Sequence, residues 1–201
     1  MRPLELAEHA SLRGVKFVLT DMDETLTYKG RLSAATYSAL EALQAAGVIV
    51  IPVTGAPAGW CDQMARMWPV DGVIGENGGL FFRRRIGSHD IDRVFWHDED
   101  SRRPASVRLE HIGRDVLREM PGATLADDQP FRLASLAFDK PEDPAQRDAI
   151  LRTLQRAGAD VTVNNLWILG WLGGYDKLAM TRRVLREQFA TDIDKEASSL
   201  L

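Results

Sequence analysis

The sequence predicts an α/β fold: a doubly wound parallel-sheet core with a second, α+β unit inserted into it. Two observations favour this prediction. Over the first third of the chain, short apolar runs alternate with amphipathic segments in the order strand, helix, strand, helix, strand. Beyond residue 79 this alternation gives way to several strands and two helices, and it resumes with a helix at 176–188. We therefore expect a core at 1–82 and 173–201 and an inserted cap at 83–172.

Local signals define the expected core elements. The apolar runs at 15–20 and 48–53 are predicted to be buried strands, the second because it is rich in β-branched residues despite Pro52. Ser33 can cap the helix between them, and Gly47 can end it. The remaining elements of this part are a helix and a third short strand, at 57–68 and 72–74.

The inserted unit is expected to place two helices against one face of a small sheet. Its helices are predicted at 108–120 and 145–157, and its strands at 132–138, 160–163 and 166–171. Two further segments, 79–85 and 92–97, are predicted to be exposed strands. The final segment, ASSLL at 197–201, is predicted to be the first residues of another strand.

Composition excludes several classes of protein. The chain has 201 residues, a formal net charge of −4 and 45% hydrophobic residues, which are ordinary values for a globular protein. This mild acidity gives no electrostatic signature of nucleic-acid binding. A single cysteine, Cys61, excludes a disulfide scaffold and is expected to pack in the core. Since no apolar run could cross a bilayer, we expect a cytoplasmic monomer or homodimer without nucleic-acid or membrane partners.

An acidic turn follows the first predicted strand, in VLTDMDETLT (18–27). Asp21 and Asp23 lie at the carboxyl end of that strand, where ligands bind in open α/β sheets. Two such acids can share Mg²⁺, which binds one or two carboxylates with water and phosphate, or act as nucleophile and general acid. A calcium loop fits less well, because Leu26 occupies the position where an EF-hand needs glycine. Taken alone, the pair could equally cap the following turn.

Two later segments supply complementary groups. The second strand leads into Thr54 and Gly55, whose hydroxyl and backbone N–H are suitable donors to a phosphoryl oxygen. Lys177, in GGYDKLAM, begins a predicted helix and can neutralise phosphate and carboxylates. Taken separately, Thr54 and Gly55 could form a plain turn, and Lys177 could be a solvated surface lysine. Their order along the chain, after successive strands, favours one common site.

These motifs resemble those of the haloacid dehalogenase (HAD) superfamily, subfamily IIB, which includes Cof-type, sucrose-phosphatase-like and mannosyl-3-phosphoglycerate-phosphatase-like phosphatases. DMDETLT resembles the first family motif, and VIVIPVTGAP the second, with Ala56 where many relatives have arginine. VIGENGG resembles the segment that leads into the cap, and GGYDKLAM the third motif. The resemblance implies an HAD-like core with an inserted cap of type C2B.

The resemblance also implies a function: a Mg²⁺-dependent phosphatase acting on a small phosphorylated metabolite, in particular a sugar phosphate. By this resemblance Asp21 attacks phosphorus to form an aspartyl-phosphate, and Asp23 protonates the leaving alcohol and later activates water. Thr54 and the N–H of Gly55 hold the phosphoryl oxygens, and Lys177 balances the negative charge. Mg²⁺ is expected between the Asp21 carboxylate, the Asp23 backbone carbonyl and the phosphate.

Further residues are candidates for binding the substrate. Gly55 is joined by Asn77, in VIGENGG, and by three residues of the predicted cap. Arg132 and Asn165 could contact substrate hydroxyls, and Trp171 could stack on a sugar.

The fourth family motif, an acidic pair of metal ligands beyond the next core strand, has no match in this sequence. Asp192 and Asp194 precede ASSLL rather than follow it, so neither is assigned to the metal. Either the chain is a fragment or its metal site is incomplete. Two alternatives to a phosphatase stay open: a phosphomutase that uses the same four residues, and a non-catalytic binding or regulatory protein on a decayed form of this fold.

Overall fold

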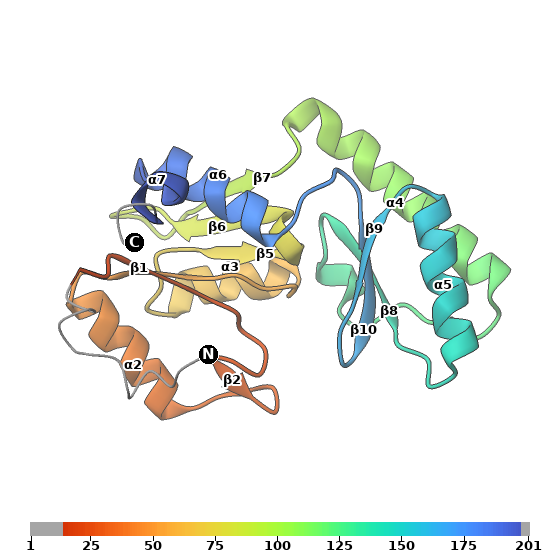
Figure 1. Cartoon of the computed structure of the whole chain (residues 1–201), viewed down its shortest axis with the longest axis horizontal. Coiled ribbons are helices and arrows are strands. Elements are labelled where there is room, and N and C mark those ends of the chain that lie inside the picture. Colours follow the sequence, from red (N-terminus) through yellow and green to blue (C-terminus); the bar gives the residue numbers. More distant parts are fainter. Residues whose placement is uncertain (1–13, 198–201) are drawn as a thin grey trace.

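Two units lie side by side in the computed structural model, which describes residues 14–197 (Figure 1). The core contains β1 (Phe17–Thr20), β2 (Thr27–Tyr28), β3 (Arg31–Leu32), α2 (Ala34–Ala45), β4 (Ile49–Pro52), α3 (Ala58–Met67), β5 (Val73–Gly75), the 3-10 helix η2 (Glu76–Gly78), β6 (Leu80–Arg84), β7 (Ile91–Phe95), α6 (Lys177–Phe189) and α7 (Ile193–Ala197). The cap contains α4 (Glu99–Glu119), the 3-10 helix η3 (Gln129–Phe131), β8 (Ser135–Asp139), α5 (Pro144–Arg156), β9 (Asp160–Val163) and β10 (Trp167–Trp171).

Parallel pairing organises the first strands of the core. β1 pairs in parallel with β4, with Thr20 opposite Pro52. An isolated parallel bridge between Val53 and Ile74 continues this arrangement to β5. β6 then pairs antiparallel with both β5 and β7. The predicted α/β core is therefore confirmed, with two antiparallel strands added to its edge.

Helices cover both faces of this sheet, as Figure 1 shows. α2 and α3 pack on one face, where Met64 and Phe82 belong to the same buried cluster. α6 packs on the other face, where Val184 and Phe81 do so. Successive residues of a strand point to opposite faces, so the neighbours Phe81 and Phe82 can fill both layers of the core.

Part of the expectation for the segment 79–85 is wrong, because the first half of β6 is buried rather than exposed. Leu80 and Phe81 are 0% exposed, since β6 lies between α3 and α6. The expected boundary between residues 82 and 83 falls inside this strand. Because β7 pairs with β6, we propose that the core continues to Phe95.

Capping residues determine where the helices begin. Ser33 caps α2 as predicted, and its hydroxyl accepts a hydrogen bond from Thr36 N at 3.0 Å. α4 begins at Glu99, earlier than predicted, because the Asp98 side chain accepts from Ser101 N at 2.8 Å. Of the strand predicted at 197–201, Ala197 ends α7, and the rest lies outside the described residues.

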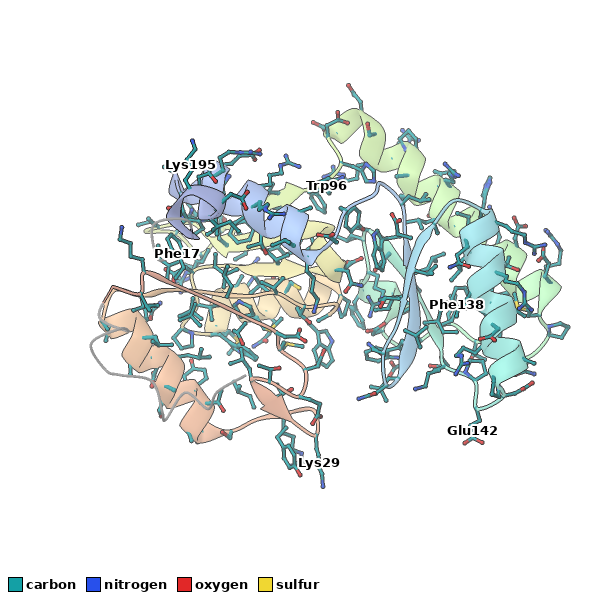
Figure 2. All side chains as sticks on the ribbon, in the orientation of Figure 1. Phe17, Lys29, Trp96, Phe138, Glu142 and Lys195 are labelled. Carbon is teal, nitrogen blue, oxygen red and sulfur yellow. The ribbon has the colours of Figure 1, made fainter. Side chains whose placement is uncertain are left out.

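The cap is an antiparallel sheet in the order β8-β10-β9, with α4 and α5 packed on one face (Figure 1). Phe138, labelled in Figure 2, is fully buried between this sheet and its helices. The opposite face presents Ala137, Leu169 and Trp171, which form a separate buried cluster with Tyr175. Within residues 14–197, no helix is both long and apolar enough to span a membrane.

Gly78 allows the closest approach between η2 and α6. Its φ is +108°, and a Cβ there would lie 2.4 Å from the carbonyl oxygen of Asp176. Asp176 in turn caps α6, because its side chain accepts from Ala179 N at 2.7 Å. The contact therefore fixes the start of α6 and, with it, the direction of Lys177.

We predict that Gly78→Ala destabilises the protein more than Gly87→Ala. Gly87 also has a positive φ, +72°, but no atom lies within 4 Å of the position of an added Cβ. Both substitutions introduce left-handed strain of about 1–2 kcal/mol, and only the first also pushes two backbone segments apart. The measurement is the free energy of unfolding in urea. Equal losses for the two variants would contradict the proposed contact.

Candidate active site

A cleft of about 1090 Å³ opens between the carboxyl ends of the core strands and the cap sheet. The loops after β1 and β4 and the start of α6 form its core side, and the β9–β10 turn and β10 form its cap side. Asp21, Gly55 and Lys177 contribute to the core wall, and Asn165 and Trp171 to the cap wall. The cleft therefore collects groups from segments that are far apart in the chain.

The acidic loop after β1 is folded tightly around one carbonyl group. The carbonyl oxygen of the buried Met22 accepts hydrogen bonds from the backbone N–H groups of Leu26 and Thr27, both at 3.0 Å. The N–H of Met22 donates to Oδ1 of Asp21 at 3.0 Å. This turn leaves both Asp21 and Asp23 on the surface of the cleft.

Lys177 joins the acidic loop from the opposite end of the sequence. Its Nζ donates to Oδ1 of Asp21 at 2.8 Å, although the two residues are 156 positions apart. The side chains are 39% and 49% exposed, so both remain accessible from the cleft. The ion pair fixes the orientation of the Asp21 carboxylate, because Oδ1 accepts from Met22 and Lys177 together.

The environment of Asp23 favours its protonated form. Partial enclosure in the cleft is the main cause that raises the pKa of this carboxyl, and the nearby negative charge of Asp21 adds to it. The positive charge of Lys177 opposes the shift without cancelling it. A carboxyl group whose pKa is raised in this way is suited to donate a proton as a general acid.

Thr54 lies behind the cleft wall rather than on it. It is 0% exposed, its N–H donates to Ile74 O at 2.8 Å, and its hydroxyl oxygen accepts from Ala56 N at 3.0 Å. The next two residues, Gly55 and Ala56, line the cleft. A Cβ on Gly55 would lie 3.1 Å from Oδ1 of Asn77, so a glycine lets these two segments approach closely.

Asn77 presents an unpaired donor at the cleft. The residue is 8% exposed with φ of 57°, and its N–H is bonded to Thr54 O at 3.1 Å. Within residues 14–197, its buried Nδ2 has no hydrogen-bond partner. A buried donor without a partner is costly, and Asn77 lines the cleft. Its side-chain amide is therefore available to a ligand oxygen.

The cap contributes alternate residues of β10 to the cleft. Trp167, Leu169 and Trp171 line it, while Ile168 packs against the cap helices. Asn165, in the preceding turn, also lines it.

Arg132, by contrast, does not reach the cleft surface. Its side chain is 0% exposed, and its guanidinium donates to Asp128, to Ser135 and to the carbonyl oxygen of Gly55. All of its nitrogen atoms are engaged, so the guanidinium is not placed to contact a substrate hydroxyl directly.

Sequence reasoning missed two contributors to this region. Trp60 lines the cleft from α3 and is 51% exposed. Glu76 is 0% exposed and bonds to residues of the cap. No sequence signal identifies its partners, because they lie in another unit of the chain.

Asp21 and Asp23 are the acidic pair available for a metal ion. Within residues 14–197, no group of three or more His, Cys, Asp or Glu side chains is arranged to hold one. Mg²⁺ often uses one or two carboxylates and completes its shell with water and phosphate. Oxygen-only donors on the acidic loop fit that requirement.

The fold and the cleft together define a class of protein: a capped α/β domain with paired aspartates after the first strand and a lysine from a late helix. The profile of the haloacid dehalogenase-like hydrolase family matches residues 18–92. A phosphoglycolate phosphatase from Methanoculleus marisnigri is 30% identical over 141 residues, which are 69% of this chain and 56% of that protein. The chain belongs to the haloacid dehalogenase superfamily, and it spans about half the length of this curated relative.

Solved structures share the fold. Thermoplasma acidophilum 0175 aligns with a TM-score of 0.68 and 19% identity, covering 90% of this chain and 74% of that one. A subclass IIB sugar phosphatase aligns with a TM-score of 0.62 and 15% identity, covering 90% and 78%. The C-terminal domain of a C. albicans trehalose-6-phosphate phosphatase aligns with a TM-score of 0.62 and 15% identity, covering 90% of this chain and 65% of that one. The expected HAD-like core with a cap of the subclass IIB type is therefore confirmed as a fold.

Proposed function

We propose that this protein is a Mg²⁺-dependent phosphatase that hydrolyses a phosphate monoester of a small metabolite through Asp21. The observation that supports this proposal most strongly is the ion pair between Lys177 Nζ and Asp21 Oδ1, at 2.8 Å, beside Asp23 in one cleft. Phosphoryl transfer depends mainly on positioning and on neutralisation of charge. A fixed carboxylate, a second acid and a cation are the groups it requires.

The reaction has two steps in this proposal. An oxygen of the Asp21 carboxylate forms a bond to phosphorus, the bond from phosphorus to the leaving oxygen breaks, and Asp23 donates its proton to that oxygen. Water then attacks the aspartyl-phosphate while Asp23 accepts a proton from it, which releases phosphate and regenerates both carboxyl groups. The raised pKa of Asp23 supports its role as the acid of the first step.

Donors to the phosphoryl oxygens come from three sources. The N–H of Gly55 and the side-chain amide of Asn77 line the same part of the cleft, and Lys177 is adjacent to the nucleophile. Thr54 holds this loop in place from behind. The Asp21 carboxylate and the backbone carbonyl of Asp23 would hold Mg²⁺, which when bound would supply further neutralisation of the phosphate charge.

We predict that Asp21→Asn abolishes Mg²⁺-dependent release of phosphate from an aryl phosphate, lowering kcat at least about 1,000-fold because the nucleophile is removed. The melting temperature should stay within a few degrees of the wild type, since Asp21 and Lys177 form an exposed ion pair. A matched control is Asp92→Asn, which removes a carboxylate paired with Arg85 at 2.7 Å, outside the cleft. Undiminished turnover by the Asp21→Asn variant would refute the assignment of Asp21 as the nucleophile.

We predict that Asn77→Gly lowers kcat/KM about tenfold or more, because a hydrogen bond to a charged group contributes ~1.5–3 kcal/mol. Glycine keeps the left-handed backbone at φ of 57° and removes only the side-chain amide. Steady-state kinetics with an aryl phosphate test this prediction. Unchanged kinetics would mean that Nδ2 does not bind the phosphoryl group.

The remainder of the cleft suits an uncharged leaving group. Among the described residues that line it, the cations are Lys177, already paired with Asp21, and Lys29. Lys29 lies over the Tyr28 ring at 5.3 Å and points away from the core at the edge of the molecule (Figure 2). Besides the acidic Glu24, Asp128 and Asp176, the cleft is lined by many aromatic, aliphatic or neutral amide side chains, which include Trp60, Gln63, Trp68, Asn164, Asn165, Leu166, Trp167 and Trp171. A sugar matches this lining, because its C–H face stacks on indole rings and its hydroxyls bond to amides.

We therefore predict that a hexose phosphate is hydrolysed with a kcat/KM at least about tenfold above that of phosphoglycolate, whose carboxylate would be desolvated without a cationic partner. The measurement is phosphate release from both compounds at equal Mg²⁺. A preference for phosphoglycolate, the substrate in the name of the curated relative, would contradict the assignment of a neutral leaving group.

A further inference from the structure

Three charged side chains are buried where the cap meets the core. Glu76 of the core is 0% exposed, and in the cap the side chains of Asp128 and Arg132 are 7% and 0% exposed. Buried charges are stable only when hydrogen bonds and opposite charges replace water. Their partners therefore show what holds the two units together.

Glu76 joins the two units from the core side. Its Oε1 accepts hydrogen bonds from Ala58 N at 3.1 Å, at the start of α3, and from Leu133 N at 2.8 Å, in the cap. Its Oε2 accepts from Ala134 N at 2.8 Å and from the Ser135 hydroxyl at 2.6 Å. One carboxylate thus binds a core helix and the segment that leads into β8 of the cap.

Arg132 joins the same units from the cap side. Its Nε and Nη2 donate to the two oxygens of Asp128 at 2.9 and 2.8 Å, which fixes the plane of the guanidinium. Its Nη1 donates to the carbonyl oxygen of Gly55 at 3.0 Å and to the Ser135 hydroxyl at 3.3 Å. The guanidinium also lies 5.8 Å from the ring of Trp167, a residue of the cleft wall.

The bonds of Glu76 and Arg132 are additional to those of the two chain segments that connect core and cap, and the Tyr175 hydroxyl of the second segment adjoins them by donating to Ala134 O at 3.0 Å. Those segments are bonded to each other, with Trp96 Nε1 donating to Gly173 O at 3.1 Å and His97 Nε2 bonded to Leu172 O at 2.8 Å. Figure 2 shows Trp96 where the two units meet. The cap is therefore also attached to the core by hydrogen bonds of the Glu76 and Arg132 side chains to groups of the other unit, and rotation about the connecting segments requires these buried bonds to break.

We propose that Glu76 and Arg132 form a clamp that holds the cap in fixed register with the core, and that Arg132 is a positioning residue for the Thr54–Ala56 loop. The positioning role rests on the proposed function, in which that loop holds the phosphoryl group. Arg132 links the Gly55 carbonyl to the Trp167 wall, so the clamp sets the separation between the phosphoryl site and the leaving-group site. Displacement of the Gly55 peptide by about 1 Å can lower turnover about 100-fold.

The first test is amide hydrogen exchange of the whole chain. Arg132→Met should speed exchange at Ala56 and Asn77, whose N–H groups bond to Thr54 in the loop that Arg132 holds. Its control is Arg108→Met, which removes an arginine–carbonyl bond inside the cap, from Nη2 to Ala157 O at 2.6 Å. The control should leave exchange in the core unchanged.

Exchange at the cap side tests the other half of the clamp. Glu76→Gln, which loses one acceptor oxygen, should speed exchange at Leu133 and Ala134. Its control is Glu119→Gln, a cap-internal glutamate bonded to Arg156 at 3.0 Å. Ser135→Ala removes the hydroxyl shared by Glu76 and Arg132, and serves as the milder variant if either of the others fails to fold.

The second test is kinetic. Arg132→Met should lower kcat for a small aryl phosphate about 10- to 100-fold with a smaller change in KM, because the misplaced loop stabilises the transition state less well. Arg132→Lys should recover part of that loss. A purely structural role would lower the melting temperature but leave kcat and KM of the folded protein unchanged.

The outcomes separate the clamp from the proposed function. Exchange in Arg132→Met that equals exchange in Arg108→Met would overturn the clamp, whatever the activity. Faster exchange with unaltered kcat would overturn the positioning role. If the wild type releases no phosphate from aryl or sugar phosphates, the proposed function fails, and the exchange experiment still decides whether the clamp exists.

Discussion

The parallel register of β1, β4 and β5 determines where chemistry can occur in this protein. Thr20 lies opposite Pro52, and the bridge from Val53 to Ile74 extends the same direction to β5. The carboxyl ends of these strands therefore meet at one edge, where the next residues of the chain must emerge together. The acidic loop, the Thr54–Ala56 loop and the segment containing Glu76 follow those strands directly, so all of them depend on this pairing.

The cap is held against that edge by hydrogen bonds from two buried charged side chains, Glu76 and Arg132, to neutral groups of the other unit. Apolar packing tolerates small displacements, whereas a shift of the cap would leave the buried side chains of Glu76 or Arg132 without their hydrogen-bond partners. The same bonds adjoin the cleft, because Gly55 lies on its core wall and Trp167 on its cap wall. Relative placement of the two units and geometry of the cleft are thus consequences of one set of interactions.

The family match and the residues of the cleft concern different parts of the proposed reaction. The family profile ends at residue 92, within the core, and so concerns the segment that contains Asp21, Asp23 and Thr54. The residues that would contact a leaving group come largely from the cap, beyond that match. A shared core therefore predicts phosphoryl chemistry, while the choice of substrate depends on cap residues that the core does not constrain.

Sequence alone determined the acidic loop, the Thr54–Gly55 turn, the lysine of GGYDKLAM and the alternation of strands and helices, because each depends on neighbouring residues and on short-range periodicity. It also singled out Asn77, although not its unpaired amide. Only the tertiary structure decided that Arg132 is buried instead of facing substrate, that β6 belongs to the core, and that Glu76 bonds to the cap. These outcomes depend on contacts between distant segments, and no local pattern specifies which buried charge will meet which backbone donor.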